Sequence, residues 1–137
     1  MEKVGAAVIG CGAIYGVHAD ALQESEYAKL LYVVDIREER AMKAADRYSC
    51  QWETDYRKIL DNKDIQVIHV CTPHHLHAEM AIEGLKAGKH VLVEKPVAIN
   101  VEQAKLMLKA SKKYKGFLGV CFQNRYNPTS VVAKQIL

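Results

Sequence analysis

The sequence lacks cysteine pairs, long apolar runs and dense blocks of like charge. Its four cysteines, at positions 11, 50, 71 and 121, include no C-x-x-C pair and lie mostly in apolar stretches. Cysteines of this kind are typical of small buried side chains in a reducing compartment. We therefore expect a cytoplasmic protein.

No apolar run reaches the roughly 18 residues that a membrane-spanning helix needs. The segment from Val4 to Val17 resembles the apolar part of a signal peptide, but glycines interrupt it and charged residues flank it. The lysines are scattered and form no basic stripe between aromatic side chains, which argues against a nucleic-acid-binding surface. The sequence also shows no internal repeat, low-complexity tract or linker.

What the sequence does contain is the composition of one globular domain. It has 137 residues, of which 50% are hydrophobic and 26% are charged, with a net charge of +3. A chain of this length can bury roughly 68–70% of the surface that it exposes when unfolded, so it can hold an ordinary core.

Short apolar runs recur along the chain and predict the strands of a sheet. They span residues 4–9, 30–34, 67–71, 91–93 and 117–122, with a shorter strand around 50–52 and a helical turn at 56–60. Most are continuous rather than alternating, which is typical of strands buried on both faces of a parallel sheet. Because helical segments separate them, we predict an α/β fold: a doubly wound, mostly parallel sheet in three α/β/α layers.

Apolar residues at helical spacing predict the buried face of each helix. The four predicted faces consist of Ile14, Val17 and Ala21; Ala41, Ala44, Ala45 and Tyr48; Ala78, Ala81, Ile82 and Leu85; and Ala104, Met107 and Leu108. Asn100 and Gln103 have the spacing of a capping box at the start of the last of these helices. Gly88 and Gly116 stand where left-handed C-terminal caps are expected.

The first strand ends in a glycine turn, and the second strand ends in Asp35. Gly10 and Gly12 allow the backbone to approach a pyrophosphate, and Ala13 and Ile14 lead into a helix whose first N–H groups attract the anion. An acidic residue about 20 positions later can accept hydrogen bonds from ribose hydroxyls. The pattern predicts a dinucleotide site, and the alternative is a tight turn that binds nothing.

The turn departs from G-x-G-x-x-G, because Tyr15 occupies the third glycine position and Gly16 follows one residue late. We expect Tyr15 to point away from the sheet or to shape the rim of the pocket.

The carboxylate of Asp35 favours NAD over NADP, because it would repel a 2′-phosphate. Arg37 and Arg40 are close enough in sequence to accept such a phosphate instead. The alternative is that both arginines lie in a solvated first helical turn with Glu38 and Glu39.

Polar residues follow each of the remaining central strands, at the edge where ligands of such sheets bind. They are Thr72-Pro73-His74-His75-Leu76-His77, Glu94-Lys95-Pro96 and Gln123-Asn124-Arg125-Tyr126. We expect Thr72 and Pro73, with His74, to pass the nicotinamide half of the cofactor. His77 is expected to orient its surroundings and His75 to lie in solvent. Zinc would need one or two ligands besides His74 and His77, and none is near in sequence, so no metal site is predicted.

Lys95 is the candidate catalytic residue. It follows a buried strand and precedes Pro96, and its ammonium group can stabilise the alkoxide character that develops on a substrate hydroxyl during hydride transfer. The alternative is a surface lysine paired with Glu94. A cis Lys95–Pro96 bond is one hypothesis for this tight turn. Gln123 and Arg125 can contact cofactor or substrate, although Arg125 can equally tie the domain to a second one.

Together these motifs resemble the Gfo/Idh/MocA family of nicotinamide-dependent oxidoreductases. The resemblance rests on GCGAI-G-H at 10–18, VVDI at 33–36, VCTPHHLHAEMAIEGLKAGKHVLVEKP at 70–96 and FQNRYNP at 122–128. It implies a Rossmann fold, with Lys95 contacting the reactive hydroxyl of a sugar, inositol or related polyol. It also implies that the cofactor is lined by Gly10, Gly12, Asp35, Thr72, His77 and Glu94. The sequence departs from the family pattern at Tyr15, where a small residue is usual, and at His74, where an asparagine-like residue is usual.

The resemblance also implies a second α/β domain that supplies the substrate pocket and the proton-transferring residue. Residues 1–124 are then the dinucleotide-binding domain, and residues 125–137 begin the connection to the second domain. We expect a fragment of a homo-oligomeric dehydrogenase that is inactive alone. The alternative is a stand-alone nucleotide-binding module that senses redox state without catalysis. A methyltransferase would leave the Glu94-Lys95-Pro96 turn without a role.

Overall fold

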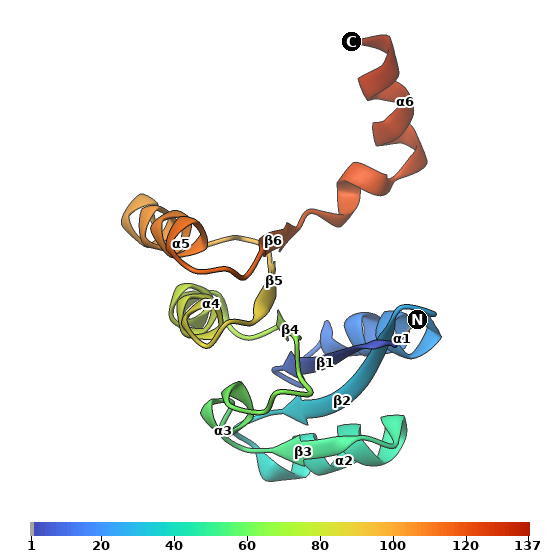
Figure 1. Cartoon of the computed structure of the whole chain (residues 1–137). Helices are drawn as coiled ribbons and strands as arrows, with labels where there is room; N and C mark the ends of the chain where they lie inside the picture. The colour runs from blue at the N-terminus through green and yellow to red at the C-terminus, as the bar shows by residue number, and fades with distance from the viewer. Residues whose placement is uncertain (1) are drawn as a thin grey trace.

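The computed structural model describes residues 2–137 and contains one six-stranded sheet (Figure 1). The strands are β1 (Val4–Ile9), β2 (Ala28–Val34), β3 (Gln51–Glu53), β4 (Val67–Val70), β5 (His90–Glu94) and β6 (Leu118–Cys121). Their order is β3-β2-β1-β4-β5-β6, and all neighbouring strands are parallel. This is the strand order of the doubly wound dinucleotide-binding sheet, so the predicted fold class is confirmed.

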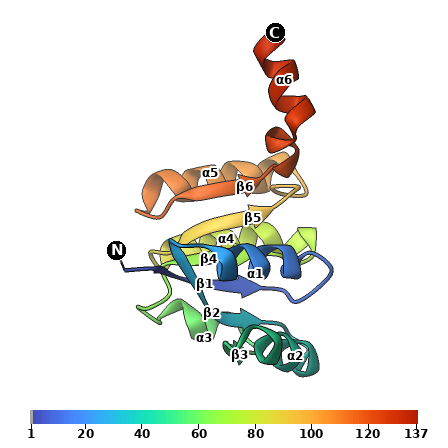
Figure 2. The ribbon, with the colours of Figure 1, turned by 90° about the vertical axis from the view of Figure 1, so that its right-hand side faces the viewer.

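Helices cover both faces of the sheet (Figures 1 and 2). They are α1 (Tyr15–Glu24), α2 (Glu38–Tyr48), α3 (Arg57–Leu60), α4 (His77–Lys86), α5 (Val101–Lys113) and α6 (Pro128–Ile136), with short 3₁₀ turns η1 (His74–Leu76) and η2 (Gln123–Tyr126). Helices α1 and α2 pack on one face, and α3, α4 and α5 pack on the other. Helix α6 projects away from the sheet and has no buried residue.

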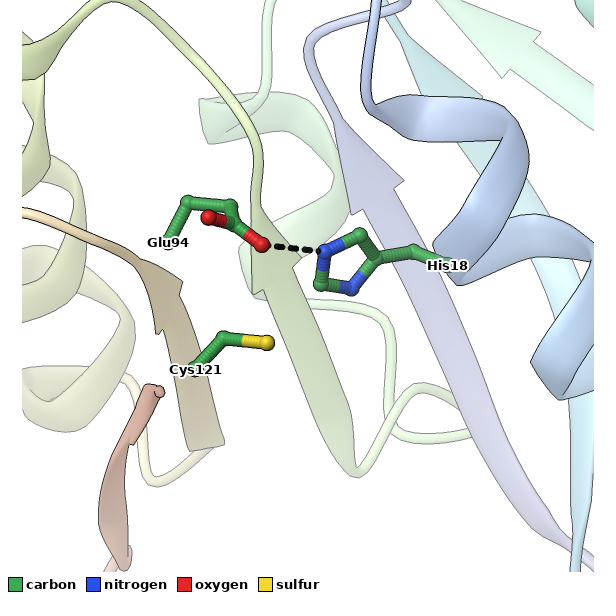
Figure 3. Close-up of side chains that lie close together, drawn as sticks. All are labelled: His18, Glu94 and Cys121. Carbon is green, nitrogen blue, oxygen red and sulfur yellow. Dashed lines mark hydrogen bonds and ion pairs between the residues drawn. The ribbon is translucent and has the colours of Figure 1, made fainter. Parts of the chain in front are cut away.

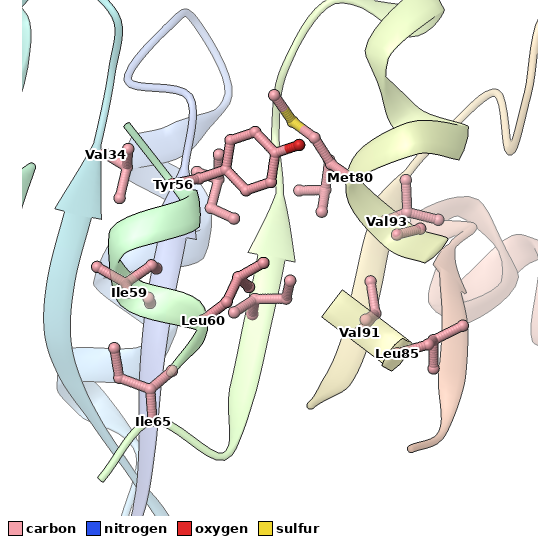
Figure 4. Packing of buried hydrophobic residues seen from close by; sticks show 14 of the residues in the cluster. Val34, Tyr56, Ile59, Leu60, Ile65, Met80, Leu85, Val91 and Val93 are labelled. Atoms are coloured by element: carbon pink, nitrogen blue, oxygen red, sulfur yellow. The ribbon is translucent and has the colours of Figure 1, made fainter. Parts of the chain in front are cut away.

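Two hydrophobic clusters hold the layers together, one on each face of the sheet. The larger cluster lies beneath α3, α4 and α5 and contains Ile59, Leu85 and Val91 (Figure 4). Val8 and Val33 belong to the smaller cluster, beneath α1 and α2. Successive residues of β1 enter opposite clusters, as a continuous apolar run predicts. Full burial of one such side chain stabilises the fold by about 1.5–3 kcal/mol.

The predicted buried face of the first helix is wrong at two of its three residues, since only Ile14 packs against the smaller cluster. Helix α1 buries His18, Ala19 and Leu22, while Val17 is 64% exposed and Ala21 is exposed. The face that α1 turns toward the sheet is not the one that its apolar residues mark, because the imidazole of His18 contacts the polar side chains of His69 and Glu94 on the sheet. The inward face of α1 therefore includes a histidine that the apolar spacing did not mark.

The predicted faces of the later helices are mostly correct, and the predicted caps are correct with one exception. Leu108 belongs to a predicted buried face but is 54% exposed. Asn100 caps α5 by accepting a hydrogen bond from the N–H of Gln103 at 2.8 Å. Gly88 has the expected left-handed conformation, with φ of +79°. Gly116 does not; a Cβ there would collide with the carbonyl of Lys89, so glycine is needed for close approach.

Within residues 2–137, every helix is too short or too polar to cross a bilayer. The four cysteines are all free thiols.

Candidate functional site

A cavity of about 320 Å³ opens at the carboxyl ends of β1, β2 and β4. The crevice between β1 and β4 is where the chain reverses its direction of winding, the usual ligand position in such sheets. Five residues predicted for the cofactor line this cavity: Gly10, Asp35, Arg37, Thr72 and Pro73. Arg40, His75 and Leu76, which the sequence places near the site, also line it, together with residues that the sequence did not single out, such as Thr54 and Met80.

Gly10 is required by the backbone at the mouth of this cavity. Its φ is +97°, and a Cβ there would lie 2.7 Å from the carbonyl oxygen of Cys71. Gly12 differs, because apart from its two chain neighbours nothing in the described chain lies within 4 Å of the position that its Cβ would take. The protein itself does not need glycine at position 12, and the open space leaves the backbone accessible to a ligand.

The N-terminus of α1 is free of side-chain caps. Its N-cap residue Ile14 makes no capping hydrogen bond, and the first turn contains no acidic residue. The first N–H groups of a helix lack partners within the helix, so this end is suited to an anion. Beside it, a cavity of about 350 Å³ is lined by Cys11, Gly12, Ala13, Tyr15, Arg40 and Lys43. Tyr15 thus shapes a pocket rim, as expected.

Asp35 links the two turns that follow β1 and β2. One carboxylate oxygen accepts a hydrogen bond from the N–H of Cys11 at 2.8 Å, and the other accepts one from the N–H of Arg37 at 2.9 Å. A carboxylate has about four acceptor positions, so roughly two remain for ligand hydroxyls. The backbone therefore fixes the orientation of Asp35 before any ligand arrives.

A separate cavity of about 440 Å³ lies beyond β5 and β6 and is lined by Lys95, Phe122, Gln123, Asn124 and Arg125. The structure thus brings three more of the predicted residues together, at a different part of the same sheet edge. The Lys95–Pro96 peptide bond is cis, which confirms that hypothesis.

His77 joins the two segments that flank these cavities. Its side chain is almost fully buried, and its ring nitrogens contact the carbonyl oxygens of Thr72 at 2.9 Å and Pro96 at 2.8 Å. Since carbonyl oxygens only accept, both contacts are hydrogen bonds only when both nitrogens carry hydrogen. His74 and His75 are both exposed, as expected for His75; His74 lines neither cavity, whereas His75 lines the 320 Å³ cavity.

Glu94 is buried beneath the Lys95 turn, among side chains that the sequence did not assign to the site (Figure 3). Its carboxylate accepts hydrogen bonds from His18 Nε2 at 2.9 Å and from the N–H of Lys95 at 3.1 Å. Burial alone would raise the pKa of Glu94, but hydrogen bonds from His18, Cys121 and Lys95 outweigh it and leave the pKa below its ordinary value.

His18 and His69 are the main omissions of the sequence-based site. A single histidine inside an apolar strand and another on an otherwise apolar helix face were the available signals. Ligand atoms of His18, Glu94 and Cys121 lie within 4.8 Å of one another, which is also the spacing of a metal site. The imidazole and the carboxylate already satisfy each other, so hydrogen bonding accounts for this geometry.

Comparison with known proteins shows the family to which this chain belongs. Residues 4–122 match the model of an oxidoreductase family with an NAD-binding Rossmann fold. The chain belongs to the Gfo/Idh/MocA family. It is 31% identical over 128 residues to the uncharacterized oxidoreductase YrbE of Bacillus subtilis, covering 93% of this chain and 38% of that protein. It is 39% identical over 106 residues to levoglucosan dehydrogenase of Pseudarthrobacter phenanthrenivorans, covering 77% of this chain and 27% of that one.

Solved structures of dehydrogenases have the same arrangement of strands and helices. The WlbA dehydrogenase from Bordetella pertussis, solved with NADH and UDP-GlcNAcA, superposes with a TM-score of 0.93 at 31% identity. The match covers 98% of this chain and 41% of that one. The chain thus spans less than half the length of these relatives.

Proposed function

We propose that this Gfo/Idh/MocA chain is the NAD-binding part of a dehydrogenase that acts on a sugar, inositol or related polyol. The observation that carries the proposal is the carboxylate of Asp35, which is held by the glycine turn at the edge of a cavity between β1, β2 and β4. Relatives that share this domain include levoglucosan dehydrogenase and inositol 2-dehydrogenase.

The residues of the site fit a dinucleotide. The 320 Å³ cavity suits an adenosine, with Asp35 beside it to accept hydrogen bonds from ribose hydroxyls. The open backbone at Gly12 and the uncapped start of α1 suit a pyrophosphate. The nicotinamide half of the cofactor would then pass along Thr72 and Pro73 toward Lys95.

The same geometry favours NAD over NADP. Both oxygens of Asp35 are anchored by backbone N–H groups, so the carboxylate does not swing away from a 2′-phosphate. Arg37 and Arg40 line the same cavity, but both are exposed, so solvent screens their charge more than that of the half-buried Asp35. NADH should therefore bind more tightly than NADPH, and Asp35→Ala should narrow the difference between them.

Bound NAD supplies the hydride acceptor, the C4 atom of its nicotinamide ring. Lys95 would contact the substrate hydroxyl and stabilise negative charge on its oxygen while the carbinol carbon gives up hydride to the cofactor and the hydroxyl proton passes to the proton-transferring residue of the second domain. The cavity shared by Lys95, Gln123 and Arg125 is the place on this chain where the substrate would lie.

Gly12→Ala tests whether a ligand occupies the glycine turn. The added methyl group meets no protein atom, so the melting temperature should change little, while NADH affinity measured by fluorescence titration should fall about tenfold or more. Gly88→Ala is the control for affinity, since its Cβ position lies in open space and outside every cavity named above. Unchanged NADH affinity in Gly12→Ala would contradict the proposed pyrophosphate position.

Lys95→Ala, made in a protein that also contains the substrate domain, tests the proposed catalytic role of Lys95. We expect kcat to fall by about 10²-fold or more while NADH affinity changes by less than about threefold. Lys105→Ala, an exposed lysine on α5, is the matched control. A kcat equal to that of the control would overturn the role of Lys95.

A further inference from the structure

Two buried polar side chains, His18 and Glu94, and the half-buried His69 form a continuous hydrogen-bonded row beneath the turn that Glu94, Lys95 and Pro96 make. His69 of β4 contacts His18 of α1 through their Nδ1 atoms at 3.1 Å. The Nε2 atom of His18 then contacts Glu94 of β5 at 2.9 Å (Figure 3). His18 and Glu94 are 6% and 7% exposed, so water competes little for the contact between them.

The positions of the protons on these three side chains follow from which atoms can donate a hydrogen bond and which can only accept one. The ionised carboxylate of Glu94 only accepts, so His18 Nε2 must carry hydrogen. One further proton lies between the two Nδ1 atoms, because two bare or two protonated nitrogens would repel each other at 3.1 Å. Burial lowers the pKa of His69 to about 4, which leaves His69 neutral at pH 7.

The row of hydrogen bonds from His69 through His18 to Glu94 ends at the backbone of Lys95. The second oxygen of Glu94 accepts a hydrogen bond from the backbone N–H of Lys95 at 3.1 Å. Glu94 is thus held from both sides, by His18 and by the residue that begins the cis turn. A carboxylate with one oxygen released would be free to rotate and would no longer define where this turn begins.

We propose that His18, oriented by His69, is a positioning residue that fixes Glu94 and thereby places the Lys95 turn for the nicotinamide half of the cofactor. This inference rests on the proposed NAD-binding function. It assigns a role in the cofactor site to a helix residue that lines none of the cavities around that site. The adenosine half is anchored separately by Asp35 and does not depend on His18.

The test compares two ligands and two substitutions of His18 in the 137-residue chain. ADP-ribose reports on the half of the site around Asp35, and NADH reports on both halves. In His18→Gln, the side-chain amide stands near the position of Nε2 and can still donate to Glu94. In His18→Asn, the amide stands near the position of Nδ1 and falls short of Glu94. The two variants therefore separate loss of the imidazole from loss of the hydrogen bond.

We expect His18→Asn to weaken NADH binding by about tenfold, the size expected for one hydrogen bond to a charged group, with ADP-ribose affinity changed less than about twofold. His18→Gln should restore NADH affinity to within about threefold of the wild type. In wild-type protein, ¹⁵N NMR should show a protonated Nε2 on His18. Circular dichroism and thermal melting check that both variants fold, and His69→Asn should weaken NADH binding less than His18→Asn.

Equal NADH affinity in the Asn and Gln variants would overturn the inference, as would equal losses of NADH and ADP-ribose binding. Stoichiometric binding of Zn²⁺ at micromolar concentration, lost in His18→Asn and Cys121→Ala, would also overturn it by making the cluster a metal site. If the wild type binds neither ligand, the proposed function itself fails, and the inference fails with it.

Discussion

The two halves of the sheet build their parts of the site in different ways. In the half formed by β1, β2 and β3, Asp35 is held by backbone N–H groups of Cys11 and Arg37. In the half formed by β4, β5 and β6, Glu94 is held largely by side chains from other elements, His18 above all. The N–H groups that hold Asp35 belong to the turns of two adjacent strands, β1 and β2, whereas the side chains that hold Glu94 depend on how α1 packs against the other half of the sheet. The first half should therefore tolerate changes in packing that the second half does not.

The largest expected effect comes from Gly10→Ala, which breaks the junction between the two halves. A left-handed φ costs a residue with a Cβ about 1–2 kcal/mol, and the contact with the Cys71 carbonyl adds to this cost. Gly88→Ala is the matched control because its φ is +79° and nothing lies near its Cβ position. Urea unfolding should show a greater loss of stability for Gly10→Ala. Equal losses of stability in the two variants would mean that the contact between the added Cβ at position 10 and the Cys71 carbonyl adds no cost of its own.

Asp35→Ala removes the anchor of the first half. We expect NADH affinity to fall about 10- to 100-fold, since hydrogen bonds to a charged group contribute about 1.5–3 kcal/mol. Asp55→Ala is the control, because Asp55 also accepts a hydrogen bond from the N–H two residues later but lines none of the cavities. Calorimetric titration of both variants makes the comparison. Similar affinities for the two variants would contradict the ribose assignment.

The second half should make stability depend on pH through His69. Burial lowers its pKa from 6.5 to about 4, so between these values the unfolded chain binds a proton that the folded chain does not. The free energy of unfolding should therefore fall as pH drops from 6.5 toward 4, and level off below that for this group. His69→Asn should show a shallower pH dependence than the wild type in urea unfolding at several pH values. Parallel curves for the two proteins would show that His69 already titrates normally.

Cys121→Ala should have the smallest effect. The thiol lies near Glu94 and is one of several groups that lower its pKa, while the hydrogen bonds from His18 and the Lys95 N–H remain. We expect a stability change below about 1 kcal/mol and an NADH affinity within about threefold of the wild type. Cys50→Ala, at a half-buried thiol in the β2–β3 half, is the control. A large loss of NADH affinity in Cys121→Ala alone would make the thiol a primary support of Glu94.

Sequence-based prediction was most accurate where one short segment determines the geometry. The apolar runs predicted the strands to within a few residues, and Asn100 was identified as a helix cap from its spacing to Gln103. It was least accurate for the buried face of α1. Helical spacing marks apolar residues, whereas this helix turns His18 inward to meet Glu94, which lies 76 residues away in the chain.

By itself, the sequence determined the strand–helix alternation, the glycine turn and the acidic residue after β2, because each depends on hydrophobic period or on local backbone shape. Only the tertiary structure decided which polar groups support the Lys95 turn. Those contacts join α1, β4 and β5, and the partners of a buried polar side chain are set by the packing of elements that lie far apart in the chain.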